Sequence, residues 1–180
     1  MNKNQKGFSL IELLIVVAII LIIAAIAIPN LLRSKMAANE AAAVGAIRTI
    51  VTAQVTYSST YNTGYATTFT ALSGAAGAAA TCAAAQLLDP TFNAAIPARS
   101  GYNFHMAANS APAVIPATAC NGADDQTFDV TAVPITVGTT GQRSFCDDQA
   151  GAIYFNPAGT AVAPGGVSCT ADGWTLPLSQ

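Results

Sequence analysis

Few side chains in this sequence of 180 residues can do acid–base or metal chemistry. His105 is the single histidine, and no serine or cysteine can be tied to it as a nucleophile, so we expect a satisfied strand residue rather than a catalyst. Six aspartates in the second half could include calcium ligands, because hard cations bind several oxygen atoms together. They match no fixed ligand spacing, and solvated turn carboxylates are the commoner case. The six are Asp124, Asp125, Asp129, Asp147, Asp148 and Asp172.

Aromatic side chains recur every four residues at Tyr57, Tyr61, Tyr65 and Phe69. The spacing has two interpretations: a stacked path for electrons, or packing of a helix end and the following loop against a sheet. We favour packing, because contacts that continue along an assembly cannot be read from one chain.

One carboxylate, that of Glu12, stands inside a long apolar segment. The stretch 8–28 carries no other charge. As a helix rising about 1.5 Å per residue it would extend roughly 30 Å, the thickness of a bilayer's hydrocarbon core. Lys3 and Lys6 precede it, and the positive-inside rule keeps that short end in the cytoplasm. We therefore expect everything after Pro29 to lie on the outer side of the membrane.

Three interpretations of this segment compete. A secretory signal peptide would have the same basic start and apolar run, and Ala25-Ile26-Ala27 offers a small-x-small cleavage site. A plain signal anchor would also fit the length. Glu12 counts against both, because a carboxylate in the apolar run is costly in lipid and serves no purpose in either.

The third interpretation rests on the run Lys6-Gly7-Phe8-Ser9-Leu10-Ile11-Glu12-Leu13-Leu14, which resembles the cleavage and methylation motif of type IV prepilins and type II secretion pseudopilins. The resemblance is specific over roughly residues 1–35. It implies that a prepilin peptidase cuts between Gly7 and Phe8, removes the basic leader on the cytoplasmic side and N-methylates the new terminus at Phe8. Gly7 suits the cut, because a residue without a side chain can lie extended in a protease cleft.

Glu12 lies four residues, one helical turn, beyond Phe8. The resemblance implies that its carboxylate pairs with the Phe8 amine of a neighbouring subunit. Because an unpaired carboxylate in lipid is costly, forming this pair would favour assembly and fix the axial register between subunits. A Glu12 that snorkels to the membrane interface would explain its tolerance but not its place in the motif.

Beyond Pro29, helical periodicity continues to about Ser58. Pro29 itself predicts a bend or local melting, and the resemblance implies that the helix loosens there in a filament. A helix from Phe8 to Ser58 would be about 75 Å long, so lipid or other subunits must cover half of it. Its apolar face is expected to hold Leu32, Met36, Val44, Ile47, Val51 and Val55. Its polar positions are Arg33, Lys35, Asn39, Glu40 and Arg48.

The rest of the chain predicts a loop followed by a sheet. The loop is low in complexity and could hold a short helix near 78–88, ended by Asp89-Pro90. From Gly101 the period shifts toward two, and four segments predict antiparallel strands: GYNFHMAA, QTFDVTAVPITV, RSFCDD and GAIYFN. The last two are expected to form a hairpin through 147–151, and Pro134 suggests an edge strand or a bulge.

The order of helix, loop and sheet resembles the pilin fold, an α+β architecture in which the long helix packs on an antiparallel sheet of about four strands. The run TVGTTGQRSFCDDQAGAIYF resembles the sheet of short bacterial pilins and pseudopilins more weakly. The expected organisation is a leader (1–7), a transmembrane or filament-core helix (8–28), an amphipathic half (29–58), a variable loop (59–100), and the sheet with a disulfide-bounded C-terminal region (101–180).

The four cysteines all follow the apolar segment. An even count on the exported side predicts disulfides, with three pairings possible. We expect Cys82 with Cys120 and Cys146 with Cys169. The resemblance implies that the second pair bounds a surface loop, which in type IV pilins often carries adhesive or antigenic variation. A zinc site is the rival, but the cysteines lack CxxC spacing and lie on the exported side.

Composition limits the function classes. Only 9% of the residues are charged and 52% are hydrophobic, which argues against a typical cytosolic enzyme. The net charge of -2 gives no broad positive field, so direct nucleic-acid binding is not expected. An anchored monomeric binding domain would have no reason for a cleavable leader, and an exported enzyme would need a catalytic constellation that the sequence does not offer. No cofactor is expected apart from the calcium considered above.

The sequence therefore predicts a non-enzymatic subunit, made as a single-pass inner-membrane precursor and polymerised into a filament. Its implied partners are other copies of itself, a prepilin peptidase, an assembly ATPase, a platform protein, and lipid before assembly. A surface type IV pilus serving adhesion, motility or DNA uptake is favoured by the disulfide-bounded tail. The alternative, a periplasmic pseudopilus for secretion, is favoured by the short sheet and the aspartates.

Overall fold

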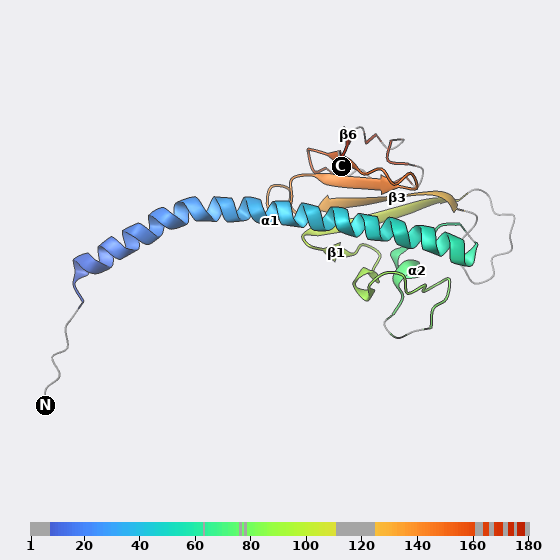
Figure 1. Ribbon diagram of the computed structural model, residues 1–180, viewed down its shortest axis with the longest axis horizontal. Helices are drawn as coiled ribbons and strands as arrows, with labels where there is room; N and C mark the ends of the chain where they lie inside the picture. The colour runs from blue at the N-terminus through green and yellow to red at the C-terminus, as the bar shows by residue number, and fades with distance from the viewer. Residues whose placement is uncertain are drawn as a thin grey trace, which may run out of the picture. The chain divides into compact units, whose positions relative to one another are not determined.

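The computed structural model describes 8–62, 64–75, 77, 79–110, 125–160, 164–165, 168–170, 173–174 and 176–178, with only the backbone at 109–110 and 125–126. The chain divides into two compact units, 1–35 and 36–180. The elements in chain order are α1 (Leu10–Tyr61), α2 (Phe69–Ser73), the 3-10 helix η1 (Pro90–Phe92), β1 (Ala98–Arg99), β2 (Tyr102–Ser110), β3 (Asp125–Pro134), β4 (Ser144–Asp148), β5 (Tyr154–Asn156) and β6 (Leu176–Pro177) (Figure 1).

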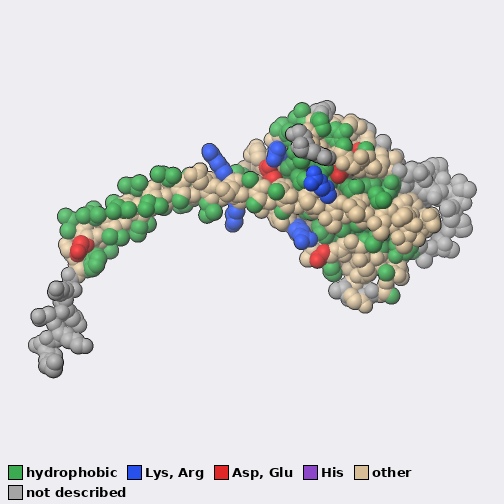
Figure 2. Space-filling view, in the orientation of Figure 1, with side chains coloured by type: hydrophobic (Ala, Val, Ile, Leu, Met, Phe, Trp, Pro, Cys, Tyr) green, Lys and Arg blue, Asp and Glu red, His purple; other side chains and the backbone are tan. Residues whose placement is uncertain are grey.

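The first unit is the apolar half of α1. Its leucine, isoleucine and valine side chains are exposed. Figure 2 shows them in green along the face that is in view. An 18-residue window is apolar enough to cross a membrane by length and composition, and none of it is buried within the structure. The helix runs through Pro29 without interruption, so the local melting expected there is absent from the single subunit. Loosening of this turn in a filament stays a prediction.

The second unit packs the remaining half of α1 against an antiparallel sheet with the strand order β1-β2-β3-β4-β5-β6 (Figure 1). Ile47, Ile50 and Tyr57 of the helix share one core with Phe104 and Val130 of the sheet. Alternation within the strands directs the side chains to two faces. The register aligns Ala132, Phe145 and Phe155 on the helix-facing side of the sheet.

The opposite face of the sheet is also covered. Cys146, Cys169 and Trp174 form a second buried cluster, against which Tyr154 packs. Its strand members alternate with those of the main core, because Cys146 lies opposite Thr131 and Tyr154 in the register. The sheet is therefore the middle layer between α1 and the C-terminal segment.

The four expected strands are present as β2 to β5. The expected β4–β5 hairpin is also present, but its loop is 149–153 and not 147–151, because Asp147 and Asp148 still belong to β4. The described residues contain two further strands, β1 and β6, each only two residues long and too short to give a period. Pro134 lies on no edge strand, contrary to expectation. It ends β3 beyond the last β3–β4 pair, Ala132 with Phe145, where β4 needs no hydrogen bond from it.

The prediction of a short helix near 78–88 is wrong for the residues that the structure describes there. The described residues there form a tight turn between Thr81 and Ala84 and then no regular structure. Their backbone N–H groups bond to another segment: Ala85 donates to the carbonyl of Ala71, and Leu87 and Leu88 donate to that of Leu72. Asp89-Pro90 begins η1 instead of ending a helix, since the Asp89 carboxylate accepts from the Thr91 N–H at 2.9 Å.

Gly45 supplies a test of helix stability. It lies inside α1, and a Cβ atom added there would meet nothing within 4 Å. We expect Gly45→Ala to raise the free energy of unfolding by about 0.5–1 kcal/mol, because glycine loses more backbone entropy than alanine in a helix. Denaturant unfolding of the full chain in detergent, followed by the fluorescence of buried Trp174, measures it.

Gly74→Ala is the matched control and should destabilise. Its φ is +74°, and a Cβ would lie 2.6 Å from the Gln86 side chain and 2.8 Å from that of Ala84. A Gly45→Ala chain no more stable than the wild type would contradict the expectation.

Candidate functional site

The start of α1 brings Ser9 and Glu12 together. The Ser9 N–H donates to Glu12 Oε2 at 3.1 Å, while the Ser9 carbonyl accepts from the Leu13 N–H at 3.2 Å. This is one of the two hydrogen bonds of a capping box, the one from the N-cap backbone N–H to the Glu side chain at N3. It also places the Glu12 carboxylate beside the positive end of the helix dipole. Glu12 thus already serves its own helix, a role that the spacing to Phe8 did not indicate.

Phe8 precedes the helix with its ring three-quarters exposed, at 75%. Gly7, the residue expected before the cut, lies outside the described residues. The end that would be processed and the carboxylate of Glu12 therefore lie within one helical turn on a segment that packs on nothing in its own unit. Such a surface can be satisfied by lipid or by other apolar helices.

The second unit holds its part of α1 by an ion pair that the sequence did not reveal. Glu40 is 8% exposed, and its Oε1 accepts from the backbone N–H groups of Gln142 and Arg143 at 2.9 and 3.1 Å. Its Oε2 accepts from the Arg143 guanidinium at 2.8 and 2.7 Å. Burial raises the pKa of the Glu40 carboxyl, but these bonds outweigh it and the net pKa lies below the usual range.

Other contacts reinforce this anchor between the helix and the β3–β4 loop. The Asn39 side chain donates to the carbonyl of Thr140 at 2.8 Å. The Arg143 guanidinium lies over the rings of Phe145 and Phe155, 5.5 and 5.4 Å from their centres. Glu40 shares a helical face with buried Ala43 and Ile47, which is the one signal that could have marked it as internal.

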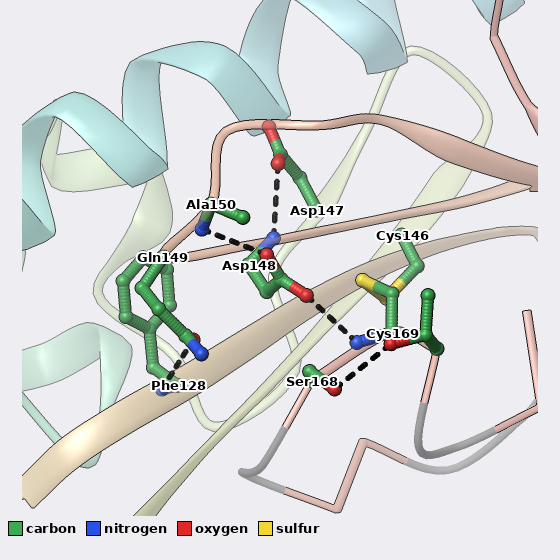
Figure 3. Close-up of a disulfide and its surroundings, with 9 residues drawn as sticks. Phe128, Cys146, Asp147, Asp148, Gln149, Ala150, Ser168 and Cys169 are labelled. Atoms are coloured by element: carbon green, nitrogen blue, oxygen red, sulfur yellow. Dashed lines mark hydrogen bonds between the residues drawn. A yellow bond between two sulfur atoms is a disulfide. The ribbon is translucent and has the colours of Figure 1, made fainter.

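The C-terminal segment is held by a disulfide and by a carboxylate (Figure 3). Cys146 and Cys169 are bonded, with 5.9 Å between their Cα atoms. The two oxygens of Asp148 accept from the N–H groups of Ala150 and Cys169 at 2.8 and 3.0 Å. Cys82 is also disulfide-bonded, but its expected partner Cys120 lies outside the described residues.

The aspartates do not form a calcium site in the part of the chain that the structure describes, where no group of three or more acidic, histidine or cysteine side chains is placed to hold a metal. The alternative expectation, that these aspartates are solvated carboxylates in turns, is also wrong for three of them. Those three are buried: Asp129, Asp147 and Asp148. The side chain of Asp125 and the whole of Asp124 and Asp172 lie outside the description.

The aromatic run packs locally. Tyr57 stacks on Tyr61 at 4.9 Å between ring centres, Tyr65 contacts Phe128 of the sheet at 4.6 Å, and Phe69 contacts Phe92 at 6.1 Å. These are the helix-end and loop contacts expected of packing. His105 lies within β2 and is half-buried.

Comparisons with known proteins concern the N-terminal part. Residues 2–28 match the family model described as the prokaryotic N-terminal methylation motif. The chain is 55% identical over 51 residues, 28% of its length and 33% of the relative's, to the type IV wide pilus major component PilA4 of Thermus thermophilus. It is 47% identical over 53 residues, 29% of its length and 24% of the relative's, to the type IV major pilin protein PilA of Myxococcus xanthus. The matches span a third or less of these curated relatives, and no solved structure matches the chain.

The anchor predicts a loss of stability when Glu40 is replaced. Glu40→Ala leaves two backbone N–H groups and the Arg143 charge without their acceptor. We expect it to lower the free energy of unfolding by about 2 kcal/mol, less than for a fully buried pair because the Arg143 side chain is 39% exposed. Glu40→Gln keeps an acceptor oxygen and should lose less. Equal stability of Glu40→Ala and wild type in denaturant unfolding would refute this role.

Asp147 predicts a pH dependence. Burial raises its pKa to about 6, reinforced by the Asp148 charge and partly offset by the Asp148 N–H and by Arg48. Between about pH 4 and pH 6, the Asp147 carboxyl is therefore largely protonated in the folded chain and largely ionised in the unfolded chain, where its pKa is 3.8. Stability falls as pH rises through this window.

We expect Asp147→Asn to remove that slope and to raise the free energy of unfolding at pH 7 by about 2 kcal/mol. Unfolding by Trp174 fluorescence between pH 5 and pH 7 measures it, a range above that in which Glu40 titrates. Asp89→Asn is the control, because the exposed Asp89 has a pKa below 3.8 and should not alter the slope. An unchanged slope in Asp147→Asn would contradict the assignment.

Proposed function

We propose that this chain is a member of the type IV pilin family and a structural subunit that polymerises from the membrane into a pilus filament. The resemblance of its N-terminus to prepilins is confirmed by the methylation-motif match and by both pilin relatives. The long helix on an antiparallel sheet agrees with the pilin fold. The proposal includes no catalysed reaction.

The observation that carries the proposal is the apolar half of α1, which lies exposed and uncovered in its own unit. In a precursor, lipid would cover it. In a filament, the same surface of neighbouring copies would cover it, so assembly moves residues 8–28 from one apolar environment to another at little cost in hydrophobic free energy. The precursor would sit in the inner membrane with 36–180 outside, and the filament would leave the cell surface.

Processing would supply a positively charged partner for the Glu12 carboxylate. A prepilin peptidase that cuts after Gly7 would create an amine at Phe8, and methylation leaves that amine charged. Glu12 Oε2 already accepts from Ser9, and a neighbour's amine would pair with the same carboxylate away from water. An assembly ATPase and a membrane platform would provide the energy for extraction.

The cell fraction that holds the mature chain, together with the mass of that chain, tests the proposed function. Cells producing the protein are sheared, and the intact mass of the chain is taken in the sheared and membrane fractions. A methylated chain beginning at Phe8 in sheared filaments is expected. A processed chain confined to the envelope would indicate a pseudopilin, and an uncut chain would overturn the proposal.

Glu12 variants separate its two roles. Glu12→Gln keeps an oxygen that accepts from the Ser9 N–H but removes the charge. If the ion pair sets register, Glu12→Gln and Glu12→Ala should both reduce sheared filament at least about tenfold, the effect of about 1.4 kcal/mol per subunit contact. Both chains should still be processed. A Glu12→Gln chain that assembles like the wild type would reduce Glu12 to a helix cap.

A further inference from the structure

The globular unit carries a groove with a basic rim on one flank of α1, here called the Arg48 groove. Its volume is about 330 Å³, and it is lined by Ala37, Glu40, Ala41, Val44, Arg48, Arg143, Phe145 and Leu178. Its apolar lining comes from all three layers of the unit: the helix, strand β4 and the C-terminal segment. The groove is thus a built feature of the folded unit.

The charge of this groove resides on Arg48. Glu40 and Arg143 neutralise one another at 2.7 Å. The exposed Arg48 has no carboxylate within ion-pair distance among the described side chains, although its charge lowers the pKa of the buried Asp147 carboxyl. A partner with one acidic group beside an apolar side chain would fit this arrangement.

The unit itself presents such a group on another flank. Among the described side chains of 36–180, Asp89 is the one exposed carboxylate. The Thr91 N–H orients it at the start of η1, next to exposed Pro90, and Ile96 nearby in the chain is 53% exposed. We call residues 89–96 the Asp89 corner.

The groove and the corner lie on different sides of α1. Asp89 lines a separate hollow with Ala42, Ala46 and Thr49. At about 100° per residue, the mean direction of these positions is rotated by roughly a third of a turn or more from that of Ala41, Val44 and Arg48 of the groove. Two surfaces on different flanks of one subunit make a head-to-tail contact that leaves one of each free, which is the kind of contact that can repeat along a filament.

We propose that the Asp89 corner of one copy docks in the Arg48 groove of the next copy of this chain, with Asp89 paired to Arg48 and Pro90 against the apolar lining. The proposal rests on the proposed function, because it names the partner as a second subunit of the filament. One exposed ion pair stabilises little by itself, but here it closes over apolar surface and repeats at every subunit.

A charge exchange tests the pairing in full-length protein. Arg48→Glu and Asp89→Lys should each lower sheared filament at least tenfold relative to the membrane pool, and the double variant should recover to within threefold of wild type. Arg33→Glu is the matched control: it reverses another exposed arginine that lines neither the groove nor the hollow beside Asp89, and it should stay within twofold of wild type. Asp89→Asn keeps the cap on Thr91 but loses the charge, so it separates pairing from folding of the corner.

Direct proximity gives a second measurement. In filaments of Arg48→Lys, carbodiimide should join Lys at position 48 to Asp89, and mixing isotopically light and heavy subunits shows that the bond joins two copies. The proposal is overturned if single reversals assemble normally, if the double variant stays as poor as the single ones, or if the cross-link forms only within one copy. Those results leave wild-type filaments intact, whereas failure of the proposed function would remove methylated filaments from the wild type as well.

Discussion

The apolar half of α1 cannot be buried by its own subunit, and this constraint governs the rest of the chain. Its side chains are exposed on every face, so no orientation of the helix on a single sheet would hide them. Under the proposed function, the chain has two acceptable surroundings for this surface, lipid and other helices, between which the free energy of transfer is small. A polar group in such a segment would then set axial position, because it is the feature that distinguishes one depth from another, and in this proposal Glu12 is that group.

The globular unit meets the opposite requirement, since it must fold without help from the apolar half. It does so by making the sheet a middle layer. The helix covers one face, and the C-terminal segment, bonded through Cys146 and Cys169, covers the other. Glu40 and Arg143 then join the helix to the β3–β4 loop, where the sheet ends and ladder hydrogen bonds are no longer available.

The sequence predicted features that depend on local patterns and missed those that depend on partners far along the chain. Helix, strands β2 to β5 and the hairpin follow from periodicity and turn residues. The predicted apolar and polar faces of α1 were partly wrong, because Val55 is exposed and Glu40 is buried. The burial of Glu40 could not be predicted, because the Gln142 and Arg143 N–H groups that donate to it lie about a hundred residues away. The alanine-rich segment at 79–88 favoured a helix by composition, yet its backbone N–H groups bond to the α2 backbone instead of to each other. The motif at Phe8 and Glu12 could be identified from the sequence, but the hydrogen bond from the Ser9 N–H to Glu12 within it could not.

The chain is poor in charge, and the structure turns most of its described carboxylates inward. Glu40, Asp147 and Asp148 each accept backbone N–H groups that lie in or beside loops, where no strand supplies an acceptor. Buried carboxylates used in this way order loops at the expense of surface charge. A surface with few charges repels copies of itself weakly, which would suit the proposed packing of the subunit with other copies. It also follows that each remaining exposed charge has a large share in deciding how two copies align.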